Sequence, residues 1–274
     1  MASEAARHLF AVAGPDTARI PLAEAALWIA AEEYPNLDVE GYVDRLDELA
    51  EVTRRAVFPC AAENRAARFN EFFFGELGFA GNTESYDDPR NSFLNDVIDR
   101  RRGIPISLSL VYTEIGTRLG LPVVGVGFPG HFLVKWLAPT ELLVDAFHGR
   151  VISRDECAER LRTSFGPNAT LDERMLAPAS PREILTRWLR NLKQNYLARG
   201  DFMRALAAVD RIVLIAPDEA SEIRDRGILY HRVECYAAAL ADFERYLTLA
   251  PNDLMAGEIR RRLPELRREA ARLQ

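Results

Sequence analysis

The C-terminal third of the chain repeats itself at an offset of 34 residues. Five positions are identical in the two copies and two more are apolar in both; the matched pairs are Tyr196 and Tyr230, Ala205 and Ala239, Leu206 and Leu240, Val209 and Phe243, Ile212 and Tyr246, Ala216 and Ala250, and Pro217 and Pro251. From about residue 183 onward the hydrophobic pattern is helical throughout. A repeat of this period is typical of short units that stack on their neighbours, so we expect a helical array here.

The repeat resembles the tetratricopeptide repeat, a helix-turn-helix unit, over roughly residues 186 to 253. It departs from that family because the early Trp is missing and Lys193 stands where the first copy would carry Gly, a place that Gly227 fills in the second. Two copies are fewer than the three or so that an independent array needs. We therefore expect residues 181–274 to form a repeat domain that packs on the rest of the chain or on its own final helix.

In the middle of the chain, a helical pattern gives way to a strand pattern. The segment ISLSLVYTEIGTRLG predicts a buried helix, with Pro105 near its start and Gly120 just past its end. The three short segments that follow, PVVGVGF, HFLVKW and ELLVDAF, are rich in Val, Leu and Phe and predict an antiparallel meander. The sequence therefore predicts an α+β core in which a buried helix packs on an antiparallel sheet.

Helical patterns also precede this core. Residues 21–57 carry apolar side chains at helical spacing, with an interruption at Pro35, and further helices are expected over ENRAARFNEFFFGEL and SFLNDVIDRRR. We place the core in residues 91–155 and assign it, together with this N-terminal helical layer, to one domain of residues 1–180.

Composition excludes several classes of function. A net charge of −6 argues against a surface that binds a phosphate backbone, so no nucleic-acid partner is expected. The N-terminus lacks the pattern of a signal peptide, and no window reaches the roughly 18 consecutive apolar residues of a membrane span, so a cytoplasmic protein without membrane contact is predicted. The three cysteines lie far apart without a CxxC spacing, which predicts no disulfide framework, no metal site and no cofactor.

His131 and Asp145 are predicted to form a pair on two adjacent strands. If residues 138–140 form the hairpin loop, Leu133 faces Asp145, and His131 lies diagonal to Asp145 on the same face, about 7–8 Å away by backbone spacing. The opposite face of the two strands is then continuously apolar; it contains Phe132, Val134, Trp136, Leu142, Val144 and Ala146. Such a pair is the base and orienter of a catalytic triad, or a structural hydrogen bond.

Two further features near this pair have alternative interpretations. Arg100, Arg101 and Arg102 form a charge run just before the buried helix, and they belong either to a solvated loop or to an anion clamp. His148 is either a turn residue or a substitute partner for Asp145.

The core motifs resemble the transglutaminase-like core, a relative of the papain-type cysteine peptidases. The resemblance rests on Gly103-Ile104-Pro105 at the start of the buried helix, TRLGLPVVGV at its end, GHFLV at His131 and VDAF at Asp145. More narrowly, RRGIPISLSLVY with PGHFLV looks like the bacterial SirB-type branch, whose members join this core to an N-terminal helical segment and a tetratricopeptide tail. The likeness runs from about residue 21 to residue 253.

This resemblance implies a Cys-His-Asp triad with its cysteine at the start of the buried helix, where the helix dipole lowers the pKa of a thiol. His131 and Asp145 match the second and third members. The position of the first falls at or beside Pro105, and the cysteines of the chain lie in other segments, at Cys60, Cys157 and Cys235. Ser107 is the nearest side chain with nucleophilic potential; its alternative role is to cap the backbone amides of the helix.

Two hypotheses of function follow. In the first, the protein is a pseudoenzyme, a binding or regulatory scaffold that receives a protein or peptide partner in a cleft near His131 or on the repeat domain. In the second, it is an acyl transferase or amide hydrolase in which Ser107 is the nucleophile, His131 the base and Asp145 the orienter. The oligomeric state is left open by the sequence.

Overall fold

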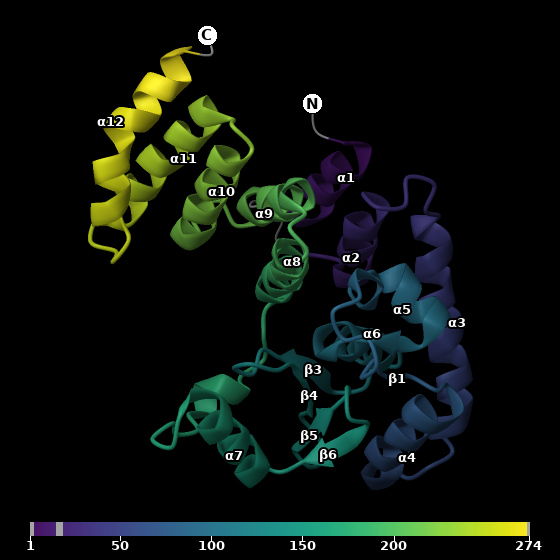
Figure 1. Ribbon diagram of the computed structural model, residues 1–274. Helices are drawn as coiled ribbons and strands as arrows, with labels where there is room; N and C mark the ends of the chain where they lie inside the picture. The colour runs from purple at the N-terminus through teal and green to yellow at the C-terminus, as the bar shows by residue number, and fades with distance from the viewer. Residues whose placement is uncertain (1–2, 15–18, 273–274) are drawn as a thin grey trace. The chain divides into compact units, whose positions relative to one another are not determined.

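Pro105 begins the central helix α6 (Pro105–Arg118) of the computed structural model, which describes residues 3–14 and 19–272 (Figure 1). The proline ring fixes φ near the helical value in the first turn. Gly120, with a φ of 68°, lets the chain leave the helix just past its end. The helix is buried over most of its surface, as its apolar sequence predicts.

The central sheet has four strands in chain order, all antiparallel: β3 (Val123–Val126), β4 (Leu133–Trp136), β5 (Leu142–Asp145) and β6 (Arg150–Ile152). Val134 pairs with Val144 and Trp136 with Leu142, which confirms the register predicted from side-chain parity. The last strand goes beyond the three that the sequence predicts. It forms because Gly149, at a φ of 66°, turns the chain back along β5.

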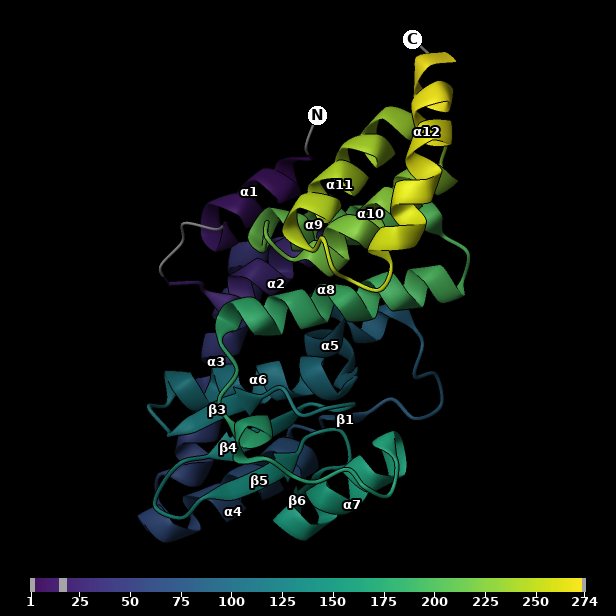
Figure 2. The ribbon, with the colours of Figure 1, turned by 90° about the vertical axis from the view of Figure 1, so that its left-hand side faces the viewer.

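The sheet lies between two helices, α6 on one face and α7 (Arg154–Phe165) on the other (Figure 2). On the α6 face, the indole Nε1 of Trp136 donates a hydrogen bond to the Tyr112 hydroxyl of α6 over 2.8 Å. On the α7 face, Leu133 and Leu143 share one apolar cluster with Leu161 of α7. Alternate residues of β4 and β5 thus face different helices, so the α+β prediction is confirmed down to the two faces.

The N-terminal layer is helical, and its elements are α1 (Glu4–Ala13), α2 (Leu22–Ala31), α3 (Val39–Val57), η1 (Ala62–Asn64), α4 (Arg65–Glu71), η2 (Phe72–Glu76), η3 (Pro89–Asn91) and α5 (Leu94–Arg100). The single helix predicted over residues 63–77 is wrong in detail, because the chain changes there from a 3-10 turn to an α-helix and then to a π-helix. The hydroxyls of Tyr34 and Tyr42 donate to Asp96 and Asp99 of α5, which fastens α5 to α3 and to the segment after α2.

The described residues divide into two compact units, residues 3–12 with 19–185 and residues 186–272 with 13–14. The elements that follow α7 are η4 (Glu173–Leu176), α8 (Pro181–Ala198), α9 (Phe202–Ile215), α10 (Ala220–Arg232), α11 (Tyr236–Leu249) and α12 (Ala256–Arg272). Ile259 and Leu266 of α12 join the apolar cluster around Phe243, so the final helix closes the repeat array. None of the helices in the described part of the chain is both long and apolar enough to cross a membrane.

The two repeats use the same turn with different residues. Gly200 has a φ of 72° between α8 and α9, and Glu234, its counterpart 34 residues later, has a φ of 62° between α10 and α11. A left-handed conformation costs a residue with a Cβ about 1 kcal/mol or more. The stacking of the helices therefore imposes this turn on the second copy even without glycine.

The position of Lys193 explains its departure from the repeat pattern. In the second copy, a Cβ on Gly227 would lie 2.8 Å from the Phe243 ring, so only glycine fits there. In the first copy, Lys193 is buried and its Nζ donates to Glu222 over 2.6 Å and to Asp225 over 2.8 Å. A buried ion pair thus replaces a close helix contact.

Candidate functional site

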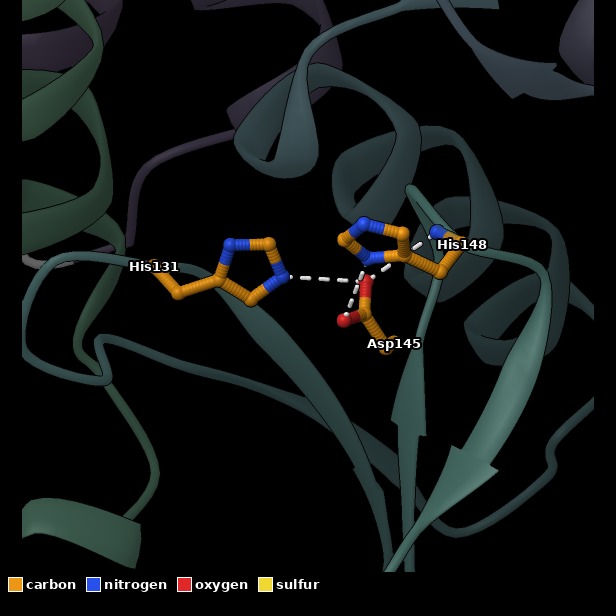
Figure 3. A group of neighbouring side chains, drawn as sticks. All are labelled: His131, Asp145 and His148. Atoms are coloured by element: carbon orange, nitrogen blue, oxygen red, sulfur yellow. Dashed lines mark hydrogen bonds and ion pairs between the residues drawn. The ribbon is translucent and has the colours of Figure 1, made fainter. Parts of the chain in front are cut away.

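Asp145 is the centre of the polar group on the α7 face of the sheet. Its side chain is fully buried at the end of β5, and both imidazole rings point a nitrogen atom at its carboxylate (Figure 3). His131 Nε2 lies 2.9 Å from Oδ1, and His148 Nδ1 lies 2.8 Å from Oδ2. Arg160 Nη2 donates to Oδ2 over 2.9 Å. The predicted pairing of His131 with Asp145 is therefore present, and His148 is a second partner.

The backbone explains why these groups meet. The register of β4 and β5 places His131 and Asp145 on one face, with His131 just before β4 begins. The turn after β5 is closed by Asp145 itself, because its Oδ1 accepts the backbone amides of Phe147, over 3.1 Å, and His148, over 3.2 Å. An aspartate that bonds the backbone two residues on is a common turn former. This turn brings the His148 ring back onto the carboxylate.

The protonation states follow from burial and from these partners. Burial lowers the pKa of His131 and outweighs the hydrogen bond and charge of Asp145, which raise it. Burial alone would raise the pKa of Asp145, but the hydrogen bonds and charges of His131 and His148 hold it well below its usual range. At neutral pH the carboxylate is therefore ionised and His131 is neutral. His131 turns Nε2 toward the carboxylate, so a base at this site would have to act through Nδ1, the nitrogen nearer the backbone.

Ser107 belongs to a different hydrogen-bond group. Its hydroxyl is buried in the first turn of α6, accepts the Ile104 amide over 3.0 Å and donates to the Asn91 carbonyl over 2.7 Å. These are the bonds of a capping residue that also ties α6 to the preceding segment. Among the described residues, Ser107 makes no hydrogen bond to His131. The structure thus brings together two of the three predicted site residues, and the nucleophilic role of Ser107 stays a prediction.

Helix α7 contributes two residues to this region that the sequence reasoning did not assign to it. Arg160 contacts Asp145, and Cys157, one helical turn earlier, is fully buried in the apolar cluster on the same face. Burial raises the pKa of the Cys157 thiol, so it is protonated at neutral pH. The start of α7 could have been predicted from the sequence, because Ser153 and Glu156 have the spacing of a capping box, which they form in the structure.

The same side chains have the composition of a small metal site. One ligand atom from each of His131, Asp145 and His148 lies within 4.8 Å of the others. Both rings, however, already point nitrogen atoms at carboxylate oxygens, and Arg160 contacts Oδ2. A divalent cation there would face a guanidinium charge at short range. The arrangement fits a hydrogen-bonded cluster better than a metal centre.

Comparison with known proteins supports the resemblance found in the sequence. The family model described as Transglutaminase-like superfamily matches residues 40–190, and the Tetratricopeptide repeat model matches residues 192–273. A UPF0162 protein of Xylella fastidiosa is 40% identical over 267 residues, which cover 93% of this chain and 92% of the relative. A UPF0162 protein of Pseudomonas aeruginosa is 36% identical over 245 residues, which cover 89% and 90%.

Protein SirB1 of Salmonella typhimurium is 26% identical over 237 residues, which cover 85% of this chain and 88% of SirB1. No solved structure matches the chain significantly. The family models and these near full-length relatives agree with the sheet, the buried helix and the helical repeats described above. The chain therefore belongs to the transglutaminase-like superfamily, in the branch of the UPF0162 proteins and SirB1.

Proposed function

We propose that the protein is a binding or regulatory scaffold in which the transglutaminase-like core works without thiol catalysis. The saturation of Asp145 carries this proposal: three side chains and two backbone amides converge on one carboxylate. In a catalytic triad the carboxylate orients one imidazole, whose other nitrogen takes the proton of the nucleophile. Asp145 instead links the start of β4, the turn after β5 and helix α7, which is a structural task.

The candidate nucleophiles near the core support the same proposal. Cys157 is buried among apolar side chains, and its raised pKa keeps it a thiol. The Ser107 hydroxyl donates its hydrogen bond to the Asn91 carbonyl rather than to a base. Acyl transfer needs a nucleophile with an adjacent base or a lowered pKa. Neither group meets this requirement.

A protein or peptide is the partner we propose. Tetratricopeptide repeats suggest protein–protein interaction, and this chain carries them over residues 192–273. We propose two surfaces for this partner, the repeat helices and the predicted cleft near His131, in the cytoplasm. The alternative function, hydrolysis by Ser107, His131 and Asp145, is favoured only by the 2.9 Å contact of the last two.

Two measurements decide between these functions. A fluorophosphonate reagent labels an activated serine; we expect no labelling of the native protein, whereas labelling that disappears in Ser107→Ala would establish the enzyme. For binding, the partner is first identified by cross-linking in cell extract, and its affinity for the purified chain is then measured. We expect His131→Ala to weaken this affinity and His8→Ala, a histidine of α1, to leave it unchanged. Equal affinities, with the cross-links on another surface, would refute the cleft as the binding site.

A further inference from the structure

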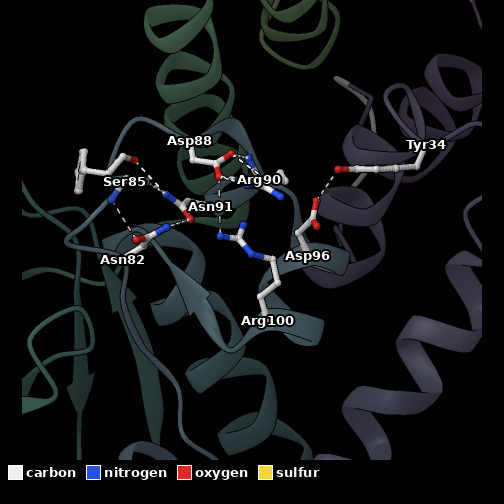
Figure 4. Close-up of polar contacts among 9 residues, drawn as sticks. Tyr34, Asn82, Ser85, Asp88, Arg90, Asn91, Asp96 and Arg100 are labelled. Carbon is white, nitrogen blue, oxygen red and sulfur yellow. Dashed lines mark hydrogen bonds and ion pairs between the residues drawn. The ribbon is translucent and has the colours of Figure 1, made fainter.

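A cavity of about 510 Å³ lies beside the arginine run that precedes α6. Figure 4 shows polar side chains of this region, among them Asp88, Arg90 and Arg100. The parallel pairing of the short strands β1 (Ala80–Gly81) and β2 (Arg102–Gly103) brings its two walls together. Its polar lining includes Thr83, Ser85, Asp88, Arg90, Arg100 and Arg102. Neither hypothesis of function uses these residues.

The wall of the cavity is already ordered by its own hydrogen bonds. Asn91 is fully buried, and its amide nitrogen donates to the carbonyls of Ser85, over 2.7 Å, and Tyr86, over 3.1 Å. The side chain of Asn82 donates to Asn91 over 2.9 Å and accepts the Ser85 amide over 3.1 Å. A loop held in this way needs no further ordering when a ligand enters.

One carboxylate of the lining is fully occupied by one arginine. Arg90 approaches Asp88 with Nε and Nη2, in the two-pronged geometry that suits a guanidinium and a carboxylate, and its backbone amide donates to the same group. These bonds hold the pKa of Asp88 below its usual range. Both oxygens of Asp88 are thus already bonded to Arg90 and are not left to pair with another cation of the cavity.

Arg100 is left without a comparable partner. The nearest acidic atom to its Nη2 is Asp88 Oδ2, 3.8 Å away, which is too far for a hydrogen bond. Its Nη1 is buried without an acceptor, and no atom of the described residues accepts a hydrogen bond from this guanidinium. Only 27% of the side chain is exposed, so water replaces few of the missing bonds. Buried polar groups are nearly always satisfied, so each exception calls for an explanation, and a ligand group that contacts this guanidinium would supply one.

The rest of the lining favours a negative partner. Arg102 donates through Nη1 to the carbonyls of Gly78 and Arg101, and its other nitrogens have no acceptor among the described residues. The hydroxyls of Thr83 and Ser85 add neutral donors. Three guanidinium groups face two carboxylates, Asp88 and the exposed Glu84, and the first of these is neutralised by Arg90.

We propose that this cavity binds a small ligand through a carboxylate or phosphate group, which Arg100 and Arg102 contact directly. Planar guanidinium groups match both of these oxyanions, and the hydroxyl donors complete the set. The cavity volume exceeds that of a single anion, so the group belongs to a larger molecule of about the size that ordinary ligand pockets enclose. This site is independent of the scaffold function proposed above.

Calorimetric titration of the full chain tests the proposal. Inorganic phosphate and acetate are titrated separately at constant ionic strength, and we expect saturable binding of one of them, which identifies the oxyanion. Arg100→Gln should lower that affinity by about tenfold or more, because a hydrogen bond to a charged group is worth at least that factor. Arg174→Gln removes an exposed arginine that pairs with Asp172 outside the cavity, so its affinity should equal that of the native chain.

Arg102→Gln gives a second route if Arg100→Gln does not fold, as judged by circular dichroism, because Arg102 lies at the exposed edge. It should also weaken binding, and by a smaller factor. The proposal is overturned if neither anion shows saturable binding to the native chain. It is also overturned if the affinity is the same in the native chain and in every folded variant of the cavity arginines.

Discussion

Replacing Asp145 by asparagine removes the charge at the centre of the polar cluster and preserves its shape. The amide keeps one acceptor oxygen, but its NH₂ group opposes either the donor of His131 or the donors of His148 and Arg160. His148 is half exposed and returns to water, so the loss falls mainly on His131 and Arg160. Hydrogen bonds to charged groups contribute about 1.5–3 kcal/mol each, and a broken buried pair costs about 3–5 kcal/mol. We expect Asp145→Asn to lower the free energy of unfolding of this unit by about 3 kcal/mol.

Hydrogen exchange measured by mass spectrometry suits this test, because the chain has two units and β5 can be followed separately. A loss of about 3 kcal/mol raises the exchange rates of the slowest β5 amides by about a hundredfold. Asp44→Asn is the matched control: Asp44 is exposed on α3, and its replacement should change the stability by less than about 0.5 kcal/mol. If Asp145→Asn changes β5 exchange no more than Asp44→Asn does, the structural role of the carboxylate is refuted.

Three further predictions concern pH and the repeat unit. Folding lowers the pKa of His131, so below about pH 6.5 the unfolded state binds more protons than the folded state. The urea midpoint of the native chain should therefore fall on acidification in this range. The midpoint of His131→Ala should fall less. Cys235→Asp should raise the free energy of unfolding by about 0.5–1 kcal/mol. Cys235 is the N-cap residue of α11 and makes no side-chain cap, while Asp201 has nearly the same backbone conformation and caps α9. An unchanged melting temperature would contradict this prediction. Lys193→Met should cost about 3 kcal/mol in urea unfolding, because it leaves Glu222 buried with fewer partners; a neutral result would show that the ion pair adds no stability.

The register of β4 and β5 was predictable from the sequence because apolar side chains at alternate positions must lie on the same face of the sheet. A slip of one residue would move Leu133 and Leu143 from the α7 cluster to the α6 face, where Trp136 bonds Tyr112. The pairing of His131 with Asp145 follows from the same register. The prediction succeeded here because the information is local to two neighbouring strands.

The partners from α7 could not be predicted in the same way. The approach of Arg160 to Asp145 depends on how a helix packs across the sheet, and no periodicity within the helix encodes that direction. The role of Ser107 had a similar limit, since a serine in the first turn of a helix suits both a cap and a nucleophile. Only the position of the Asn91 carbonyl, 16 residues away in the sequence, shows which acceptor the Ser107 hydroxyl bonds.

On the proposed scaffold function, the structure also explains what the His-Asp pair does in a chain with no cysteine in α6. In an active triad, the second nitrogen of His131 would accept the proton of the nucleophile. Without a nucleophile, the His-Asp pair would have no catalytic role. Here Asp145 contacts His131 before β4, accepts two backbone amides in the turn before β6 and binds Arg160 of α7, so its removal would loosen three segments at once. On the proposed scaffold function the stability of these segments is enough to account for the pair, so the 2.9 Å contact by itself does not establish catalysis. Evidence for an enzyme would have to come from a nucleophile, and the side chains nearest that role, Ser107 and Cys157, are engaged elsewhere.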